Sequence, residues 1–146
     1  MIVILTQCFP SRTGGIESLI SNLALSLSKN FKVVVFADRY NLFFDAIYDN
    51  SIKDNFLVHR TRGIKFFRRR RKIKELKPFI FSGKIECVIA ESWKSLELCN
   101  DLLVQKKIPT ICLAHGNEII KKDCKKNKKI INTLEKCNSI VANSEY

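Results

Sequence analysis

Long apolar runs and export signals are both missing from this sequence of 146 residues. No stretch approaches the roughly 20 consecutive apolar residues that a membrane-spanning helix requires. The apolar opening Met1–Leu5 has no positively charged segment before it, and the segment from Pro10 to Gly15 interrupts it before a signal-peptide core could form. We therefore expect a cytoplasmic protein, and the length suits one domain, spanning residues 1–146, rather than two.

Paired cysteines and the standard glycine motifs are also lacking. The six cysteines include no C-x-x-C pair. In a chain without an export signal we expect them to be reduced thiols that fill the core, and not disulfides or a metal site. The glycines match neither G-x-G-x-x-G nor G-x-x-x-x-G-K-[ST]. An internal repeat or a linker-like tract is absent as well.

Acidic residues are scarce, because 14 Asp and Glu stand against 26 Lys and Arg and give a net charge of +12. This excess predicts attraction to anions such as nucleic acid, acidic lipid head groups or sugar nucleotides. Much of it is lysine among many asparagine and isoleucine residues. A bias in composition therefore explains the charge equally well.

What the chain does contain is an alternation of short β-rich runs and helical patterns. The β-rich runs predict strands at Ile2–Thr6, Lys32–Ala37, Leu57–His59, Cys87–Ala90, Thr110–Leu113 and Ser139–Ala142. The helical patterns predict Ile16–Ser28, Ile64–Phe81 with Pro78 distorting or ending it, Leu96–Val104, and a short helix up to Lys136 that follows a lysine-dense connection over Lys121–Lys129. The alternation indicates an α/β protein with a Rossmann-like, doubly wound and mainly parallel sheet.

Two parts of the chain do not fit this alternation of strands and helices. The segment Asp38–Asn55 is rich in aromatic residues and poorly periodic, so its structure is left open. The chain ends at Tyr146, directly after a predicted strand, where such a fold normally continues into a helix. We therefore expect a fragment of a longer protein or a shortened gene product.

Two glycines lie at the carboxyl edge of the predicted sheet, where parallel α/β proteins bind their ligands. Gly14 and Gly15 stand at the entry of the first predicted helix. A glycine lets the backbone approach a phosphate closely, and the helix N-terminus adds partial positive charge, so the loop can hold a pyrophosphate. From the turn alone the alternative is favoured, namely a tight strand-to-helix connection in which Glu17 complements the helix dipole.

Other polar residues follow later strands at the same edge. His115 lies two residues after the end of the strand at Leu113, and it can donate a hydrogen bond to a substrate hydroxyl or to charge developing on a leaving group. Asn117 and Glu118 either contact substrate or cap a following helix. Glu91 is a candidate for acceptor contact, whereas Trp93 stacks on a sugar or base or, more commonly, packs in the core.

The run Arg68–Lys72, preceded by Phe66 and Phe67, has the composition of a helix that lies on anionic lipid. Contact with nucleic acid phosphates is an alternative, but no zinc finger, helix-turn-helix or aromatic RNP strand accompanies the run. A solvated helix face is the commonest explanation of such runs.

Three segments together resemble the N-terminal domain of the family 4 glycosyltransferases, which have the two-domain GT-B architecture. They are Phe9–Glu17 with its helix and next strand to Ala37, then Ala114–Glu118, and then Ile140–Tyr146. Their order and placement span almost the whole chain.

The resemblance implies a retaining transfer from a nucleotide-sugar donor, without metal or other cofactor, in the cleft between two Rossmann-like domains. It implies that Gly14 and Gly15 approach the donor diphosphate and that His115 contacts the donor sugar. Acceptors in the family are often lipid-linked or are growing cell-envelope glycans, which places such an enzyme at the inner face of a membrane. The family's C-terminal, donor-binding domain has no counterpart in these residues, so a donor site would need that domain in cis or in trans.

Two other functions stay open at this stage. The chain can be an inactive remnant or interaction module that keeps the fold without catalysis. It can also be a basic α/β protein that binds nucleic acid through its charge.

Overall fold

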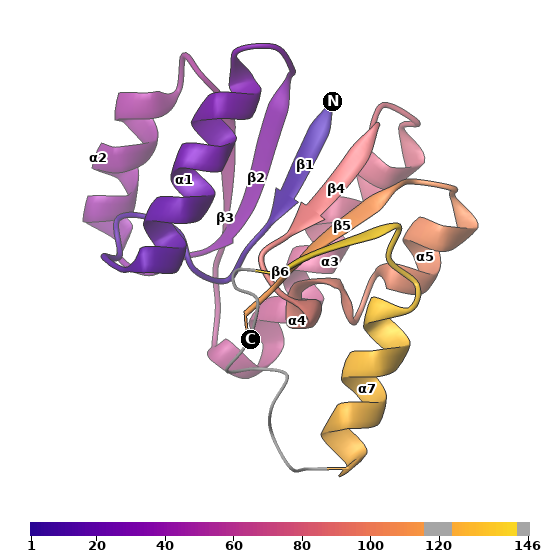
Figure 1. Cartoon of the computed structure of the whole chain (residues 1–146). Helices are drawn as coiled ribbons and strands as arrows, with labels where there is room; N and C mark the ends of the chain where they lie inside the picture. Colours follow the sequence, from indigo (N-terminus) through magenta and orange to yellow (C-terminus); the bar gives the residue numbers. More distant parts are fainter. Residues whose placement is uncertain (116–123, 143–146) are drawn as a thin grey trace.

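The computed structural model describes residues 1–115 and 124–142, apart from the side chains of Lys65 and residues 124–126. The described residues form one six-stranded, all-parallel sheet with helices on both faces (Figure 1). The predicted Rossmann-like α/β class is therefore confirmed. The strands are β1 (Ile2–Leu5), β2 (Val33–Asp38), β3 (Leu57–Thr61), β4 (Cys87–Ala90), β5 (Thr110–Ala114) and β6 (Ser139–Ala142).

The strands are arranged in the order β3-β2-β1-β4-β5-β6. The chain therefore builds outward from β1 in one direction and then returns to the other side of β1 with β4. Adjacent strands whose connections leave in opposite directions open a crevice at their carboxyl ends. In this protein the crevice lies after Leu5 and Ala90, which are paired in the sheet.

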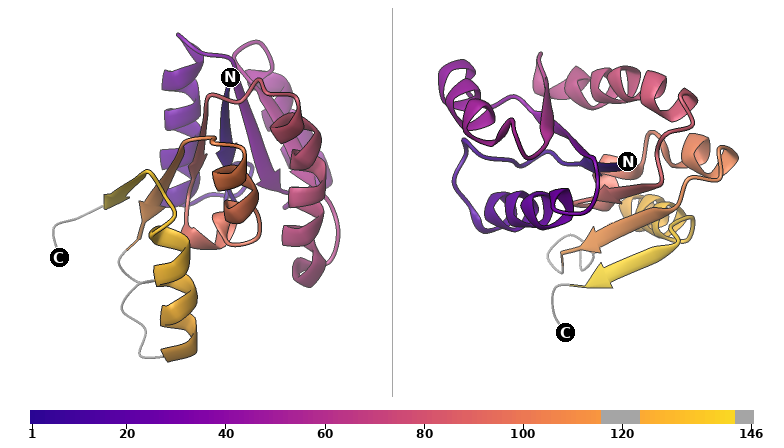
Figure 2. Two further views of the ribbon diagram at one scale, coloured as in Figure 1. Left: turned by 90° about the vertical axis from the view of Figure 1, so that its right-hand side faces the viewer. Right: turned by 90° about the horizontal axis from the view of Figure 1, so that it is seen from above.

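The helices cover the two faces of the sheet in separate groups (Figure 2). Alternate residues of each strand point to opposite faces, so Val3 and Leu5 belong to one buried cluster and Ile2 and Ile4 to the other. Helices α1 and α2 contribute to the cluster of Ile2, and the remaining helices pack on the opposite face. The helices are α1 (Gly15–Ser28), α2 (Leu42–Ile52), α3 (Lys65–Phe81), α4 (Trp93–Leu96), α5 (Asn100–Gln105) and α7 (Cys124–Leu134).

Helix α2 occupies the segment that the sequence pattern left open. The side chain of Asn41 caps it by accepting hydrogen bonds from the backbone N–H groups of Phe43 and Phe44, at 3.0 and 3.1 Å. Asp45 accepts a further bond from the N–H of Asn41 at 3.1 Å. The aromatic residues of the first turn face solvent, which explains why no apolar periodicity was visible.

The prediction of one helix over Leu96–Val104 is wrong, because the structure has two short helices there, α4 and α5. Cys99 lies between α4 and α5 with a backbone outside the helical region. The side-chain amide of Asn100 donates to the carbonyl of Thr133 at 2.7 Å, which fixes the start of α5 against α7. This contact joins residues 33 positions apart, so the local apolar pattern contains no sign of it.

One helix boundary differs from the sequence pattern, and another agrees with it. The lysine-dense connection was expected up to Lys129, but α7 already begins at Cys124, with Ile130 buried in the core. Helix α3 ends at Phe81, as predicted, and of the two alternatives for Pro78 the one in which the proline ends the helix is excluded. No helix among the described residues combines the length and apolar character needed to cross a bilayer.

Candidate functional site

The loop after β1 is organised by the carboxylate of Glu91, which follows β4. Glu91 Oε2 accepts hydrogen bonds from the backbone N–H groups of Gln7 at 2.9 Å and Cys8 at 3.0 Å. It also accepts a bond from the hydroxyl of Thr6. Glu91 is buried, so one carboxylate fixes the backbone at the mouth of the crevice. Its predicted contact with an acceptor stays a prediction, and its observed contacts are within the protein.

A buried lysine reaches the same loop from α3. Lys72 Nζ forms an ion pair with Asp38 Oδ1 at 2.6 Å and donates a hydrogen bond to the carbonyl oxygen of Thr6. Asp38 is the last residue of β2, so the pair joins helix α3 to the carboxyl ends of β1 and β2. The second carboxylate oxygen of Asp38 lies 3.4 Å from Arg68 Nη1. Residues from three elements therefore hold this part of the edge in one arrangement.

Burial shifts the pKa values of these groups. Burial raises the pKa of Glu91, although the bonds from Thr6, Cys8 and Gln7 and the nearby Lys72 act in the opposite direction. Burial lowers the pKa of Lys72, and Asp38 opposes that change. Burial also raises the pKa of the Cys8 thiol to about 11, so Cys8 is a neutral thiol at physiological pH and not a ready nucleophile.

A groove of about 930 Å³ opens at this edge between the loop after β1, helix α3 and helix α4. Five cationic and two anionic side chains contribute to its lining, so the groove has a net positive charge, which favours an anionic ligand. Four of the five cations, Arg12, Arg68, Arg69 and Lys129, form ion pairs with carboxylates. Arg70 is exposed on its rim, whereas Arg69 Nη2 is held by Glu97 Oε2 at 2.6 Å. The lining residues are Gln7, Cys8, Arg12, Asp38, Phe66, Arg68, Arg69, Arg70, Glu97, Leu98 and Lys129.

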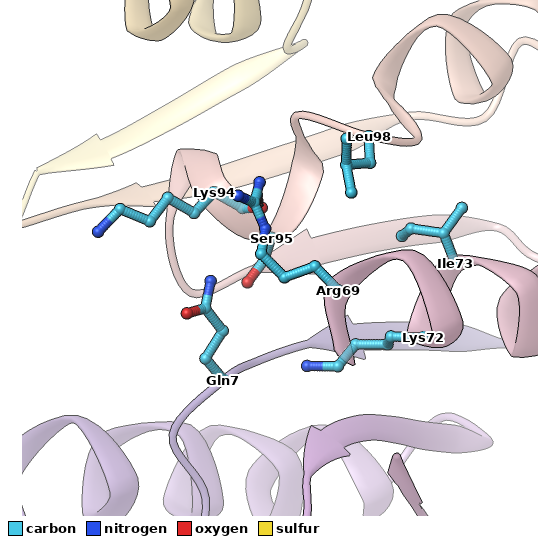
Figure 3. A pocket seen from close by; sticks show the side chains of 7 residues that line it. All are labelled: Gln7, Arg69, Lys72, Ile73, Lys94, Ser95 and Leu98. Carbon is cyan, nitrogen blue, oxygen red and sulfur yellow. Dashed lines mark hydrogen bonds between the residues drawn. The ribbon is translucent and has the colours of Figure 1, made fainter. Parts of the chain in front are cut away.

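A smaller cavity of about 10 Å³ shares Gln7, Arg69 and Leu98 with this groove. In Figure 3, Gln7 from the loop and Arg69 from α3 extend toward the start of α4. Gln7 Nε2, Arg69 Nε and Ser95 Oγ are buried and have no hydrogen-bond partner within the described residues. All three can donate a hydrogen bond, so the cavity can receive one oxygen atom of a ligand.

The carboxylate of Glu17, in the first turn of α1, lies against the glycine loop that follows β1. Glu17 is buried, folds back toward Gly14, and forms an ion pair with Arg12 at 3.1 Å between Oε1 and Nε. A Cβ at Gly14 would overlap the Glu17 carboxylate, whereas a Cβ at Gly15 meets no atom within 4 Å. Glu17 thus complements the helix dipole as the alternative reading of this turn required. Gly15 leaves open space beside the helix N-terminus, and its contact with a diphosphate stays a prediction.

The remaining predicted site residues have different outcomes. His115 is half-buried and directly follows β5, so it lies at the same edge of the sheet as Glu91 and Gly15. Asn117 and Glu118 lie outside the described residues, as does the segment 143–146 of the third motif. Trp93 is buried in the core, as the packing interpretation expected.

Sequence reasoning missed Lys72 and Gln7 as parts of this edge. Lys72 is the last cation of a run of five, and nothing in the run marks it as the one that turns inward. A helical projection gives the available signal, because Lys72 precedes Ile73 and lies four residues before Leu76, both of which are buried. Gln7 follows the strand without a recognisable motif. Its backbone N–H is bound by Glu91, a residue 84 positions away, so no local pattern marks it.

Comparison of the sequence with models of known protein families and with curated proteins gives no match. Among residues 1–115 and 124–142, no three His, Cys, Asp or Glu side chains converge as metal ligands do.

Proposed function

We propose that this chain is the acceptor-side, N-terminal half of a retaining family 4-type glycosyltransferase with a nucleotide-sugar donor. A donor-binding domain, supplied in cis or in trans, would complete the site. The cationic groove of about 930 Å³ at the carboxyl edge, beside the crevice between β1 and β4, is the observation that carries the proposal. A sheet of this order binds its ligands at that crevice.

The positions of the motif residues support the proposal. Gly15 follows β1, Glu91 follows β4 and His115 follows β5, and these three strands are neighbours in the sheet. A donor held over this edge by a second domain would have its diphosphate near the open space at Gly15. His115 would then contact the donor sugar near the reacting carbon.

The charge of the groove indicates the class of acceptor. Arg70 is exposed in its lining, and arginine binds phosphate oxygens through paired N–H groups. Arg68, Arg69 and Lys129 add positive charge there but form ion pairs with Asp38 and Glu97. The three donors at the smaller cavity can bind one further oxygen. We therefore propose a phosphate-bearing, lipid-linked acceptor or an anionic glycan, at the cytoplasmic face of a membrane.

In the proposed reaction the acceptor hydroxyl oxygen forms a bond to the anomeric carbon of the donor sugar. The bond from that carbon to the nucleoside diphosphate breaks, and its electron pair leaves with the diphosphate. The hydroxyl proton is released with the same product. The residues of this chain would bind and orient the acceptor and stabilise the negative charge near the leaving group.

The proposal is tested by joining the chain to its donor-binding domain and measuring turnover of sugar nucleotides. Production of nucleoside diphosphate, with transfer to a phosphate-bearing acceptor and retention of the anomeric configuration, would support it. If the completed protein turns over no sugar nucleotide, the chain keeps the fold without the chemistry and the interaction-module alternative gains support. Salt-dependent binding to generic duplex DNA in its place would support the nucleic-acid alternative.

A further inference from the structure

Large apolar side chains are concentrated at the starts of α2 and α3, where both helices leave the carboxyl edge of the sheet (Figure 1). All seven are exposed, with Phe43 at 67% and Phe66 at 80% of their surface. An exposed apolar patch of this kind marks an interaction surface. We call this set the aromatic rim, and it consists of Tyr40, Leu42, Phe43, Phe44, Ile64, Phe66 and Phe67.

The two halves of the aromatic rim belong to neighbouring loops. The backbone N–H of Arg39, before α2, donates to the carbonyl of Thr61, before α3, at 3.0 Å. Within each half the rings pack edge to face, at 5.6 Å between the centroids of Phe43 and Phe44 and 5.3 Å between those of Phe66 and Phe67. Side chains in the first turn of a helix tilt toward its N-terminus, so both halves project from the carboxyl edge.

The cations beside the aromatic rim lie near the N-terminus of α3, where the helix dipole favours negative charge. Arg68–Arg71 occupy the first two turns of α3, and that helix has no acidic residue in its first turn. Positive side chains near a helix N-terminus oppose the macrodipole. A bound anion removes this conflict, so the arrangement fits an anionic partner better than solvent.

The acidic residues of the same region are turned inward. Asp45 is buried and accepts hydrogen bonds from the N–H groups of Tyr40 and Asn41, at 2.9 and 3.1 Å. Asp38 is occupied by Lys72 and Arg68. The exposed positive charge around the aromatic rim is carried by Arg62, Arg70 and Arg71. Of these, Arg71 forms an exposed ion pair with Glu75 at 3.7 Å on the same helix.

We propose that the aromatic rim docks on a bilayer containing anionic lipid, with its rings in the head-group region and the neighbouring arginines on lipid phosphates. Exposed aromatic side chains flanked by arginine are the composition of interfacial membrane anchors. The docking proposal rests on the proposed function in one respect, namely that a transferase with a lipid-linked acceptor needs to reach the bilayer that holds it. Sequence reasoning gave a lipid interpretation to α3 alone, and the structure adds the start of α2.

Docking in this orientation would bring the groove to the lipid surface. Phe66 belongs both to the aromatic rim and to the lining of the groove. Arg68, Arg69 and Arg70 continue from it along the same helix into the groove. A phosphate-bearing head group bound by the exposed Arg70 would therefore lie at the opening of the groove.

The test is co-sedimentation of the full chain with phosphatidylcholine vesicles that contain phosphatidylserine, and with vesicles of phosphatidylcholine alone. We expect binding only to the anionic vesicles. Phe43→Ser with Phe44→Ser, and separately Phe66→Ser with Phe67→Ser, should each weaken it by about tenfold or more. Arg70→Glu with Arg71→Glu should weaken it by a similar factor, and these exposed positions do not disturb the core.

The matched control is Phe31→Ser with Phe81→Ser. These rings are 46% and 61% exposed but lie at the opposite, amino edge of the sheet, so binding should be unchanged. Equal binding to both kinds of vesicle, or a wild-type affinity in either aromatic double variant, would overturn the proposal. Absence of vesicle binding together with self-association that the aromatic variants abolish would overturn it in favour of a protein interface. Donor turnover plays no part in this assay, so its outcome is separate from that of the transferase proposal.

Discussion

The carboxylate of Glu91 accepts a hydrogen bond from the backbone N–H of Cys8 at 3.0 Å, which ties the end of β4 to the loop that follows β1. Because these strands border the crevice, the bond fixes the backbone next to the candidate site. The same carboxylate accepts from Gln7 and Thr6, and the backbone N–H of Gln7 has no other acceptor in the loop, so removal of the carboxylate leaves that donor without a partner. Glu91 is therefore a positioning residue in this structure.

Replacement of Glu91 should reduce stability strongly. We expect Glu91→Ala to lower the free energy of unfolding by about 3 kcal/mol, because a buried donor without a partner costs about 1–3 kcal/mol. Glu91→Gln should cost less, since the amide oxygen can still accept from the loop. Urea denaturation followed by circular dichroism measures both. Equal losses for the two variants would contradict the role of the oxygen as an acceptor.

The stability difference between the wild type and Glu91→Gln should depend on pH. Burial raises the pKa of Glu91 above its ordinary value of 4.5, so the folded protein favours the protonated carboxyl. The advantage of the wild type over this variant is then greatest below that ordinary value and declines as the pH rises through the pKa of the folded state. Denaturation of both proteins between about pH 4 and pH 8 tests this. A difference that grows with pH would show the opposite shift.

The ion pair of Lys72 with Asp38 should be needed for stability. Lys72→Met removes the nearer of the two cations on Asp38 and leaves the carbonyl of Thr6 without this donor, so we expect a loss of about 3 kcal/mol. Lys74→Met is the control, because Lys74 is exposed on the same helix and its loss should stay within about 0.5 kcal/mol. Equal unfolding midpoints for the two variants would contradict this account.

The cysteine thiols should differ in their reactivity. A hydrogen bond from Cys112 lowers the pKa of Cys137 to about 7, despite partial burial, whereas burial raises the pKa of Cys8 to about 11 and of Cys99 to about 12. Since the thiolate is the nucleophile, iodoacetamide near neutral pH should modify Cys137 about a hundredfold faster than Cys8. Peptide mapping by mass spectrometry after timed quenching measures these rates. Faster alkylation of Cys8 would be inconsistent with its burial.

Substitutions of the two glycines at the start of α1 should have different effects, one on stability and the other on ligand binding. Gly15→Val meets open space and should leave the unfolding midpoint nearly unchanged, while its branched side chain blocks a diphosphate from the backbone. Gly14→Ala is the comparison, because its Cβ displaces Glu17 and should destabilise the fold. Isothermal titration of the completed protein with a nucleotide sugar measures the donor affinity. Wild-type affinity in Gly15→Val would leave this turn with a structural role only.

The sheet was predictable because its strands carry uninterrupted apolar runs, as in Val33–Ala37, that only burial on both faces explains. Helix α2 was not predictable from periodicity, since its aromatic first turn faces outward. Asn41 and Asp45 did mark its start, but cap residues also occur in turns. Local chemistry alone does not distinguish these two uses.

The candidate site was predictable only where residues directly follow strands. His115 and Glu91 could be assigned to the carboxyl edge on that basis. The inward turn of Lys72 and the convergence of Gln7 with Ser95 depend on how α3 and α4 pack against the loop, which no short sequence pattern encodes. Tertiary contacts decided those positions.

The most direct test of the transferase proposal is the turnover number of the completed protein for a nucleotide sugar, compared between the wild type and His115→Ala. We predict turnover by the wild type and a decrease of about a hundredfold or more in the variant, with an unchanged circular dichroism spectrum, because one lost donor near developing charge has that effect. Wild-type turnover in His115→Ala would remove this histidine from the mechanism. No turnover by either protein would contradict the proposed function itself.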